Sequence, residues 1–122
     1  MAVTTNAVAS PRQLYQGQPG TSVASLNYTS PGYTSNVDSP SATAYITEIL
    51  FCNTTDTAAT ISLFMGGTTA AFAFVYNLTV EPYDVIVMPF QEHTMIPAGT
   101  TLYGSQGTSG AITVTMSGAE VQ

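Results

Sequence analysis

Residues 44–53 read AYITEILFCN, and this stretch decides the fold class. Alternate residues of an extended chain point to opposite faces. One face of this stretch carries Tyr45, Thr47, Ile49 and Phe51, and the other carries Ile46, Glu48, Leu50 and Cys52. Both faces are mostly apolar, which is typical of a strand buried on both sides. We therefore expect a central strand, with Glu48 near its end or close to a partner.

The segments that follow repeat this extended pattern. Residues 60–65 carry an apolar row formed by Ile61, Leu63 and Met65. Residues 72–80 alternate most regularly, and their expected inward row is Phe72, Phe74, Tyr76, Leu78 and Val80. Residues 85–88 form a further strand, which we expect to end at Pro89 because proline cannot donate a hydrogen bond to a strand ladder.

Shorter strands are expected nearer the two ends of the chain, at residues 14–16, 23–28, 102–104 and 111–121. Gly, Pro and Asn turn signals separate all these segments, and no window has the period of a helix. About eight short strands of this kind predict an all-β protein, an antiparallel β-sandwich. A jelly roll is one of the topologies that the pattern allows, and the strand order is left open.

The sequence divides into an arm and one domain. Residues 1–13, MAVTTNAVASPRQ, are small and polar without a stable period, and we expect an extended N-terminal arm. Residues 14–122 are expected to form the β-sandwich domain. Within it, residues 29–43 contain Pro31, Pro40 and many serines, which predicts a long loop of the kind that often carries contacts.

Charge is scarce in this chain. Charged residues make up 7% of the 122 residues, against roughly 25% in an ordinary soluble domain. The net charge is -6, and Arg12 is the only lysine or arginine. One cation cannot neutralise a row of phosphates, so the composition argues against nucleic-acid binding. It argues equally against docking on an anionic membrane.

Threonine and serine take the place of charged residues along the chain. Short hydroxyl side chains lose little conformational entropy when a neighbour covers them. We therefore expect a surface that is partly buried in contacts with other chains of an assembly. The alternative is a stable soluble monomer.

Groups that could carry chemistry are few. The single histidine, His93, lies beside Glu92, and the single cysteine, Cys52, lies in an apolar run. Acid/base catalysis and metal binding both need several such groups that converge. We expect no catalytic residue, metal or cofactor, and a buried inert thiol at Cys52. His93 is expected in a loop or an interface, and the alternative is a ligand shared around a symmetry axis. Neither a signal peptide nor an apolar run of about 20 residues is recognised, so we expect synthesis in the cytosol.

Tyrosines are the more informative polar residues. Tyr28 precedes the Pro/Ser loop, Tyr33 lies near its start, and Tyr83 lies at a turn. Exposed tyrosines serve protein contacts and stack on sugar rings, which makes these three candidate partner-binding residues. The alternative is a tyrosine at the end of a sheet with its hydroxyl group in water.

Four segments resemble a family of small virion proteins of tailed bacteriophages: residues 12–21 (RQLYQGQPGT), 49–55 (ILFCNTT), 96–103 (IPAGTTLY) and 112–121 (ITVTMSGAEV). The similarity spans residues 12–121. The first segment adds Arg12, Leu14 and Tyr15 to the candidate partner-binding residues. The long Pro/Ser loop at 29–43 departs from the compact form expected in this family.

The resemblance implies a structural role in the virion. The first expectation is a capsid decoration (cement) protein that binds the major capsid protein on the outer surface of a phage head. Such proteins often form homotrimers and grip the shell with an N-terminal arm. The alternative is a tail or fibre-base accessory subunit with a role in binding the host surface or carbohydrate. The resemblance implies no catalytic residues.

Overall fold

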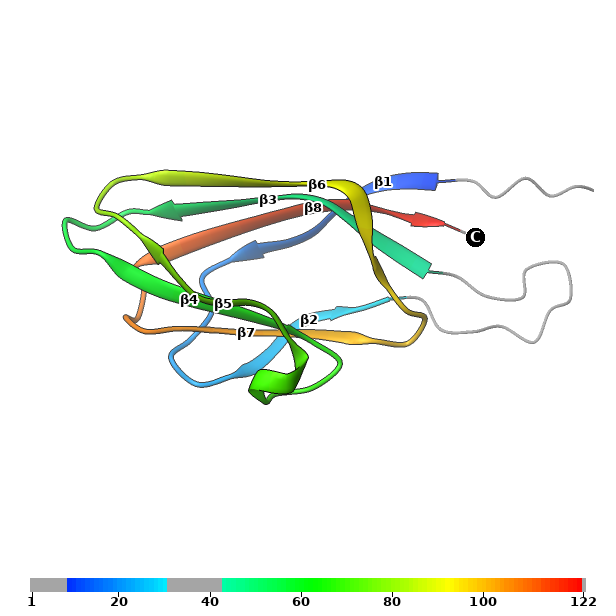
Figure 1. Ribbon diagram of the computed structural model, residues 1–122, viewed down its shortest axis with the longest axis horizontal. Coiled ribbons are helices and arrows are strands. Elements are labelled where there is room, and N and C mark those ends of the chain that lie inside the picture. Colours follow the sequence, from blue (N-terminus) through cyan, green and yellow to red (C-terminus); the bar gives the residue numbers. More distant parts are fainter. Residues whose placement is uncertain (1–8, 31–42, 122) are drawn as a thin grey trace, which may run out of the picture.

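The computed structural model describes residues 9–30 and 43–121, which form eight strands and one short 3-10 helix, η1 (Ala70–Phe72) (Figure 1). The strands are β1 (Ala9–Gly17), β2 (Ala24–Thr29), β3 (Thr43–Asn53), β4 (Ala59–Met65), β5 (Ala73–Val80), β6 (Val85–Ile96), β7 (Thr101–Gln106) and β8 (Ile112–Val121). The predicted all-β class is confirmed.

The strands form two antiparallel sheets that face each other (Figure 1). Their strand orders are β1-β8-β3-β6 and β2-β7-β4-β5. The first strand pairs with the last, β2 with β7, β3 with β6, and β4 with β5. The two halves of the chain therefore pair as one long antiparallel hairpin, which reverses direction between β4 and β5. This hairpin is rolled into two sheets, so that β3 also pairs with β8 and β4 also pairs with β7. This is a jelly-roll topology, and the predicted sandwich is confirmed.

The core fills the space between the two sheets. Its fully buried side chains come from both inner faces and are mostly aliphatic. β3 lies between β8 and β6, which confirms its central position. In β8, the predicted inward residues Ile112, Val114 and Met116 have no exposed area. The period of two therefore predicted this strand correctly.

A bulge interrupts the alternation in β3. The register with both neighbouring strands shifts between Ile46 and Glu48, and as a result Ile46 and Ile49 both point into the core. The expectation that Tyr45 and Thr47 share the face of Ile49 is therefore wrong. A bulge adds one residue to one strand, so the side chains on its two sides change faces.

A second bulge changes β5. Asn77 has a positive φ of 49°, and its backbone N–H donates to the hydroxyl oxygen of Ser62 at 2.8 Å instead of to the ladder. As a result Val75 is buried, whereas Tyr76 is 60% exposed. The regular alternation predicted the opposite orientation for both residues. The predicted inward side chain of Phe72 is also exposed, in η1 before the strand.

β6 continues through Pro89 to Ile96, so the expected end of this strand at Pro89 is wrong. Among the described strands, β6 pairs only with β3, at the edge of the first sheet. A proline is tolerated at such an edge because its nitrogen can face away from the ladder.

β1 begins at Ala9 rather than at Leu14 and pairs with β8 along its whole length. Residues 9–13, expected as part of an arm, therefore belong to the edge strand of the first sheet. Residues 1–8 lie outside the described residues. So do residues 31–42, which make up most of the expected Pro/Ser loop.

Three strands approach closely at Gly118, which pairs with Arg12 of β1 and Ile46 of β3. A Cβ atom at this position would overlap the backbone oxygen of Tyr45 and lie 2.9 Å from Cδ1 of Leu14. Since the overlap involves backbone, only glycine fits here.

Candidate protein-interaction surface

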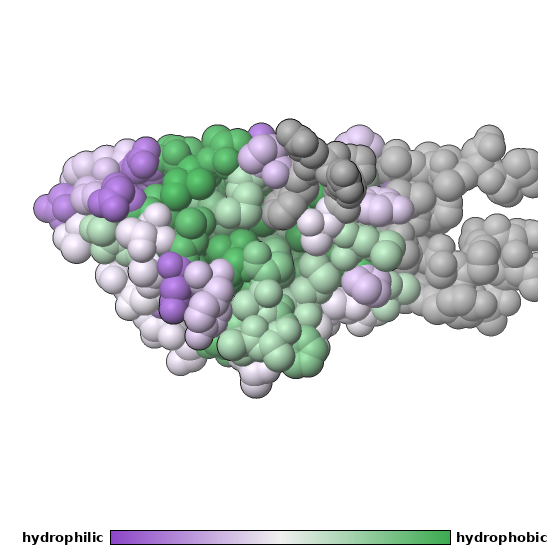
Figure 2. Space-filling model, in the orientation of Figure 1, coloured by the Kyte–Doolittle hydropathy of each residue, from purple (hydrophilic) through white to green (hydrophobic). Residues whose placement is uncertain are grey.

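Large hydrophobic side chains are exposed on one side of the sandwich. Among the described residues, those between 46% and 71% exposed are Phe72, Tyr76, Tyr83, Val85, Val87 and Met95. All of them belong to η1, β5, β6 or the turn between these two strands. β5 and β6 are the edge strands of their sheets, and hydrophobic residues gather along this side in Figure 2. We call these six residues the apolar edge.

The β6 part of the apolar edge continues onto the outer face of the first sheet. Ile86 packs against the core, so its neighbours Val85 and Val87 point outward. Val85 pairs with Cys52, and Val87 pairs with Leu50. Both partners are half-buried. The four residues Val85, Val87, Leu50 and Cys52 form an uncharged stripe, which we call the apolar strip.

The end of the sandwich beside the apolar strip is acidic. Asp56 lies between β3 and β4, and Glu81 and Asp84 lie between β5 and β6; all three are exposed. The backbone N–H of Tyr83 donates to the carbonyl oxygen of Thr55 at 3.1 Å and holds the two turns together. Figure 2 shows hydrophilic residues at this end. We call the two turns the acidic turns.

The opposite side of the sandwich is closed by polar contacts around Glu120 of β8. Arg12 Nε of β1 lies 2.8 Å from Glu120 Oε1, and the hydroxyl group of Tyr28 in β2 donates to Glu120 Oε2 at 2.7 Å. Burial raises the pKa of Tyr28 well above its ordinary value, and the hydrogen bond and charge of Glu120 raise it further, against an opposite effect of Arg12. This Arg12–Glu120–Tyr28 cluster joins the two sheets and engages the chain's single arginine.

Four of the candidate partner-binding residues make contacts with other parts of the sandwich, although the Arg12 side chain stays 58% exposed. Arg12 and Tyr28 meet at Glu120. Leu14 is buried in the core, and Tyr15 packs against the core, where burial raises its pKa.

Tyr83 is 71% exposed and belongs to the apolar edge, whereas Tyr33 lies outside the described residues. Sequence analysis missed Val85 and Val87 as surface residues. A signal was present in residues 85–88, VIVM, which are apolar on both faces. Only the inner face of β6 packs against the second sheet, so the outer face, which carries Val85 and Val87, is exposed.

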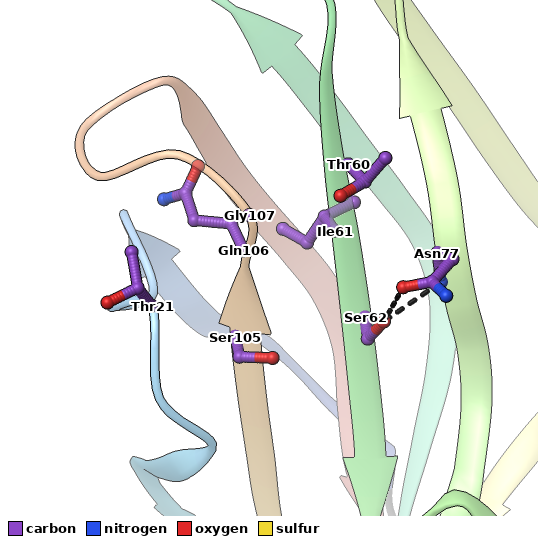
Figure 3. Close-up of a pocket in the computed structure, with 8 residues that line it drawn as sticks. All are labelled: Thr21, Thr60, Ile61, Ser62, Asn77, Ser105, Gln106 and Gly107. Carbon is purple, nitrogen blue, oxygen red and sulfur yellow. Dashed lines mark hydrogen bonds between the residues drawn. The ribbon is translucent and has the colours of Figure 1, made fainter.

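A small polar pocket lies on the outer face of the second sheet (Figure 3). Its volume is about 150 Å³, and its lining residues are Thr21, Thr60, Ile61, Ser62, Asn77, Ser105, Gln106 and Gly107. The Gln106 amide is already bonded to the backbone of Pro19 and Ile112. The lining has hydroxyl and amide groups but no titratable group, so it suits a small neutral polar ligand and offers no acid or base.

Groups for other chemistry are sparse in the described part of the chain. Within residues 9–30 and 43–121, no three His, Cys, Asp or Glu residues lie together in a way that could hold a metal ion. No helix among these residues is long and apolar enough to cross a membrane. His93 lies within β6, and Cys52 is a half-buried free thiol in β3.

No protein-family model matches the chain, and no curated protein matches it. Two solved structures of infectious bursal disease virus are similar to it. For the Gx strain, the identity is 14% and the TM-score 0.45 over 95% of this chain and 31% of that one. For the Gt strain, the values are 15% and 0.43 over 96% and 30%. The chain spans about a third of the length of the chains it matches. These matches assign no family, and the resemblance to tailed-phage proteins stays a prediction.

Proposed function

We propose that the chain is a non-enzymatic structural protein of a virus particle and docks on another protein through its apolar edge. The observation that carries the proposal is the gathering of the exposed large hydrophobic side chains, among the described residues, on one side. An exposed apolar patch beside polar surface is typical of a protein-interaction site.

The fold and the composition support the same role. Jelly rolls occur in viral capsid proteins and in lectins. The fold is therefore compatible with capsid decoration and with a carbohydrate-binding tail subunit, and does not distinguish between these two roles. A surface with 7% charged residues and many hydroxyl groups loses little entropy when covered. The resemblance of residues 12–121 to small tailed-phage virion proteins favours the virion.

Capsid decoration is the first choice within this role. The chain would bind the major capsid protein on the outer surface of a phage head and stabilise the shell, as a homotrimer whose N-terminal arm grips the surface. Because residues 9–13 belong to β1, deleting residues 1–13 would also remove part of an edge strand. Deletion of residues 1–8 therefore tests the role of the arm in binding without removing part of β1.

The experiment mixes the purified chain with heads assembled without it and images the particles. We expect saturable binding in many copies over the head, and a higher temperature of shell disruption because a ligand stabilises the state it binds. Deleting residues 1–8 should weaken binding and leave the unfolding transition unchanged. Binding of a few copies at the tail alone would contradict decoration, and a free, solitary protein in the native setting would overturn the structural role.

A tail or fibre-base subunit that binds carbohydrate is the second candidate. The polar pocket near Asn77 favours it, because neutral hydroxyl and amide groups suit a sugar. Glycan binding that is lost in Asn77→Ala or Tyr83→Ala, but kept in the exposed control Gln16→Ala, would support this candidate.

A further inference from the structure

The free backbone edge of β6 is blocked at two positions. The N–H of Asn53 donates to the carbonyl oxygen of Asp84 at 3.0 Å, so the backbone of residue 84 faces β3. Backbone groups face alternate sides along a strand, so those of Val85, Val87 and Pro89 face away from β3. The N–H of Val85 is bonded to Asp84 Oδ1 at 2.9 Å, and Pro89 has no N–H. Within residues 85–89, Val87 alone offers a donor to an added strand.

Strand addition at this edge is therefore unfavourable. A partner strand needs a row of donors and acceptors, and capped or proline-bearing edges are a known protection against such pairing. What β6 offers instead is side-chain surface. Val85 and Val87 are each about half exposed, and Leu50 and Cys52 extend the surface inward. A partner can pack on the face of the apolar strip without joining the sheet.

The negative charge of the acidic turns indicates which kind of partner can bind beside the apolar strip. Asp56, Glu81 and Asp84 are exposed in the acidic turns that adjoin the apolar strip. The chain's single arginine is engaged by Glu120 on the other side of the sandwich. A second copy docked on the same surface would bring three more carboxylates close to these three, and like charges across an interface are repulsive. A partner with lysine or arginine would instead be attracted.

We infer that the apolar strip and the acidic turns bind a protein segment in which lysine or arginine lies beside apolar side chains, and that this segment packs on the face of β6 without strand addition. The inference deepens the proposed function and rests on it for the source of the segment, a virion protein. The chemistry of the segment follows from Val85, Val87 and the three carboxylates.

The first test measures binding to heads assembled without the chain. The double variant Val85→Thr/Val87→Thr keeps side-chain size and β-branching but makes the strip polar, and we expect roughly tenfold weaker binding. The control Gln16→Thr changes an exposed residue of β1, the other edge of the same sheet, and should bind like the wild type. Equal binding of the double variant and the control would overturn the inference.

The electrostatic part is tested with Asp56→Asn/Glu81→Gln, which leaves the Asp84 cap in place. This variant should bind more weakly at low salt and lose most of the salt dependence, because screening acts on the attraction that was removed. Val85→Thr/Val87→Thr should keep the salt dependence of the wild type. Unchanged salt dependence in the charge variant would overturn the choice of a basic partner.

The second test separates the inference from the proposed function. Two synthetic peptides that alternate valine with lysine or valine with glutamate are titrated into the full chain and followed by amide NMR. We expect the lysine peptide to bind roughly tenfold more tightly at low ionic strength, with shifts at residues 81–88 and no exchange protection at Val87. Equal affinities, protection of the Val87 amide, or self-association through β6 would overturn the inference. If heads do not bind the wild type but the lysine peptide does, the proposed function fails and the inference stands.

Discussion

The two long sides of the sandwich end in opposite ways. On the side of β1 and β2, Arg12 and Tyr28 meet at Glu120 and join the two sheets by polar contacts. On the side of β5 and β6, the sheets end in exposed hydrophobic residues and in a backbone edge that Asp84 and Pro89 protect from pairing. The closed side contributes stability to the fold, whereas the open side keeps apolar area available to a partner. Removing that area from water would contribute roughly 25 cal/mol of favourable free energy for each Å² buried.

The largest loss of stability is expected from Gly118→Ala in β8, the strand between β1 and β3. The added methyl group would overlap the backbone oxygen of Tyr45, and backbone cannot move as a flexible side chain can. We expect a loss of about 3 kcal/mol or more in the free energy of unfolding, measured by urea denaturation. Gly20→Ala is the control, since a Cβ atom there meets nothing within 4 Å. Equal effects of the two substitutions would contradict the close approach of the three strands.

Tyr28→Phe should weaken the closed side by a smaller amount. The substitution removes the donor to Glu120, whose side chain is 16% exposed, and leaves that oxygen poorly solvated. We expect a loss of about 1–2 kcal/mol in the free energy of unfolding. Tyr83→Phe, at an exposed tyrosine of the open side, should leave stability unchanged. If both variants lose the same amount, the cluster does not join the sheets.

The same tyrosine predicts a pH dependence. Its pKa is raised in the folded chain, so the folded state keeps this proton at a pH where the unfolded state releases it. The stabilisation is complete below pH about 10, the ordinary pKa of tyrosine, and is lost as the pH rises from there towards the folded pKa. The slope is at most about 1.4 kcal/mol per pH unit for one proton. Urea unfolding at pH 9, 10 and 11 should show a flatter decline in Tyr28→Phe than in Tyr83→Phe.

The smallest effect on stability is expected on the open side. Val85→Thr/Val87→Thr alters exposed side chains that the core does not need, so the free energy of unfolding should change by less than about 0.5 kcal/mol. Thermal or urea unfolding checks this. The same variant should bind heads more weakly, and that contrast separates the two sides. A large loss of stability would show instead that the valines belong to the fold.

The sequence predicted the fold well but the site only in part. The alternation in residues 112–116 and the two-faced apolar run at 44–53 led to the correct class, the central strand and the sandwich. Arg12 and Tyr28 were selected as partner contacts; both contact Glu120 within the chain, and their role in binding a partner stays a prediction. Tyr83 does lie on the exposed surface, whereas Val85 and Val87 were missed. The position of a strand at an edge depends on residues far away in the chain, and a local pattern does not contain it.

By itself, then, the sequence determined that this chain forms short strands, buries a mostly aliphatic core and carries almost no positive charge, because backbone period and composition are local properties. Tertiary structure decided the rest. The bulges at Thr47 and Asn77 reverse which side chains face the core, since the registers with neighbouring strands shift there. The rolled ribbon brings residues 12, 28 and 120 together on one side and leaves β5 and β6 as edges on the other. Pairing over such long sequence distances is selected by the packing of the whole core.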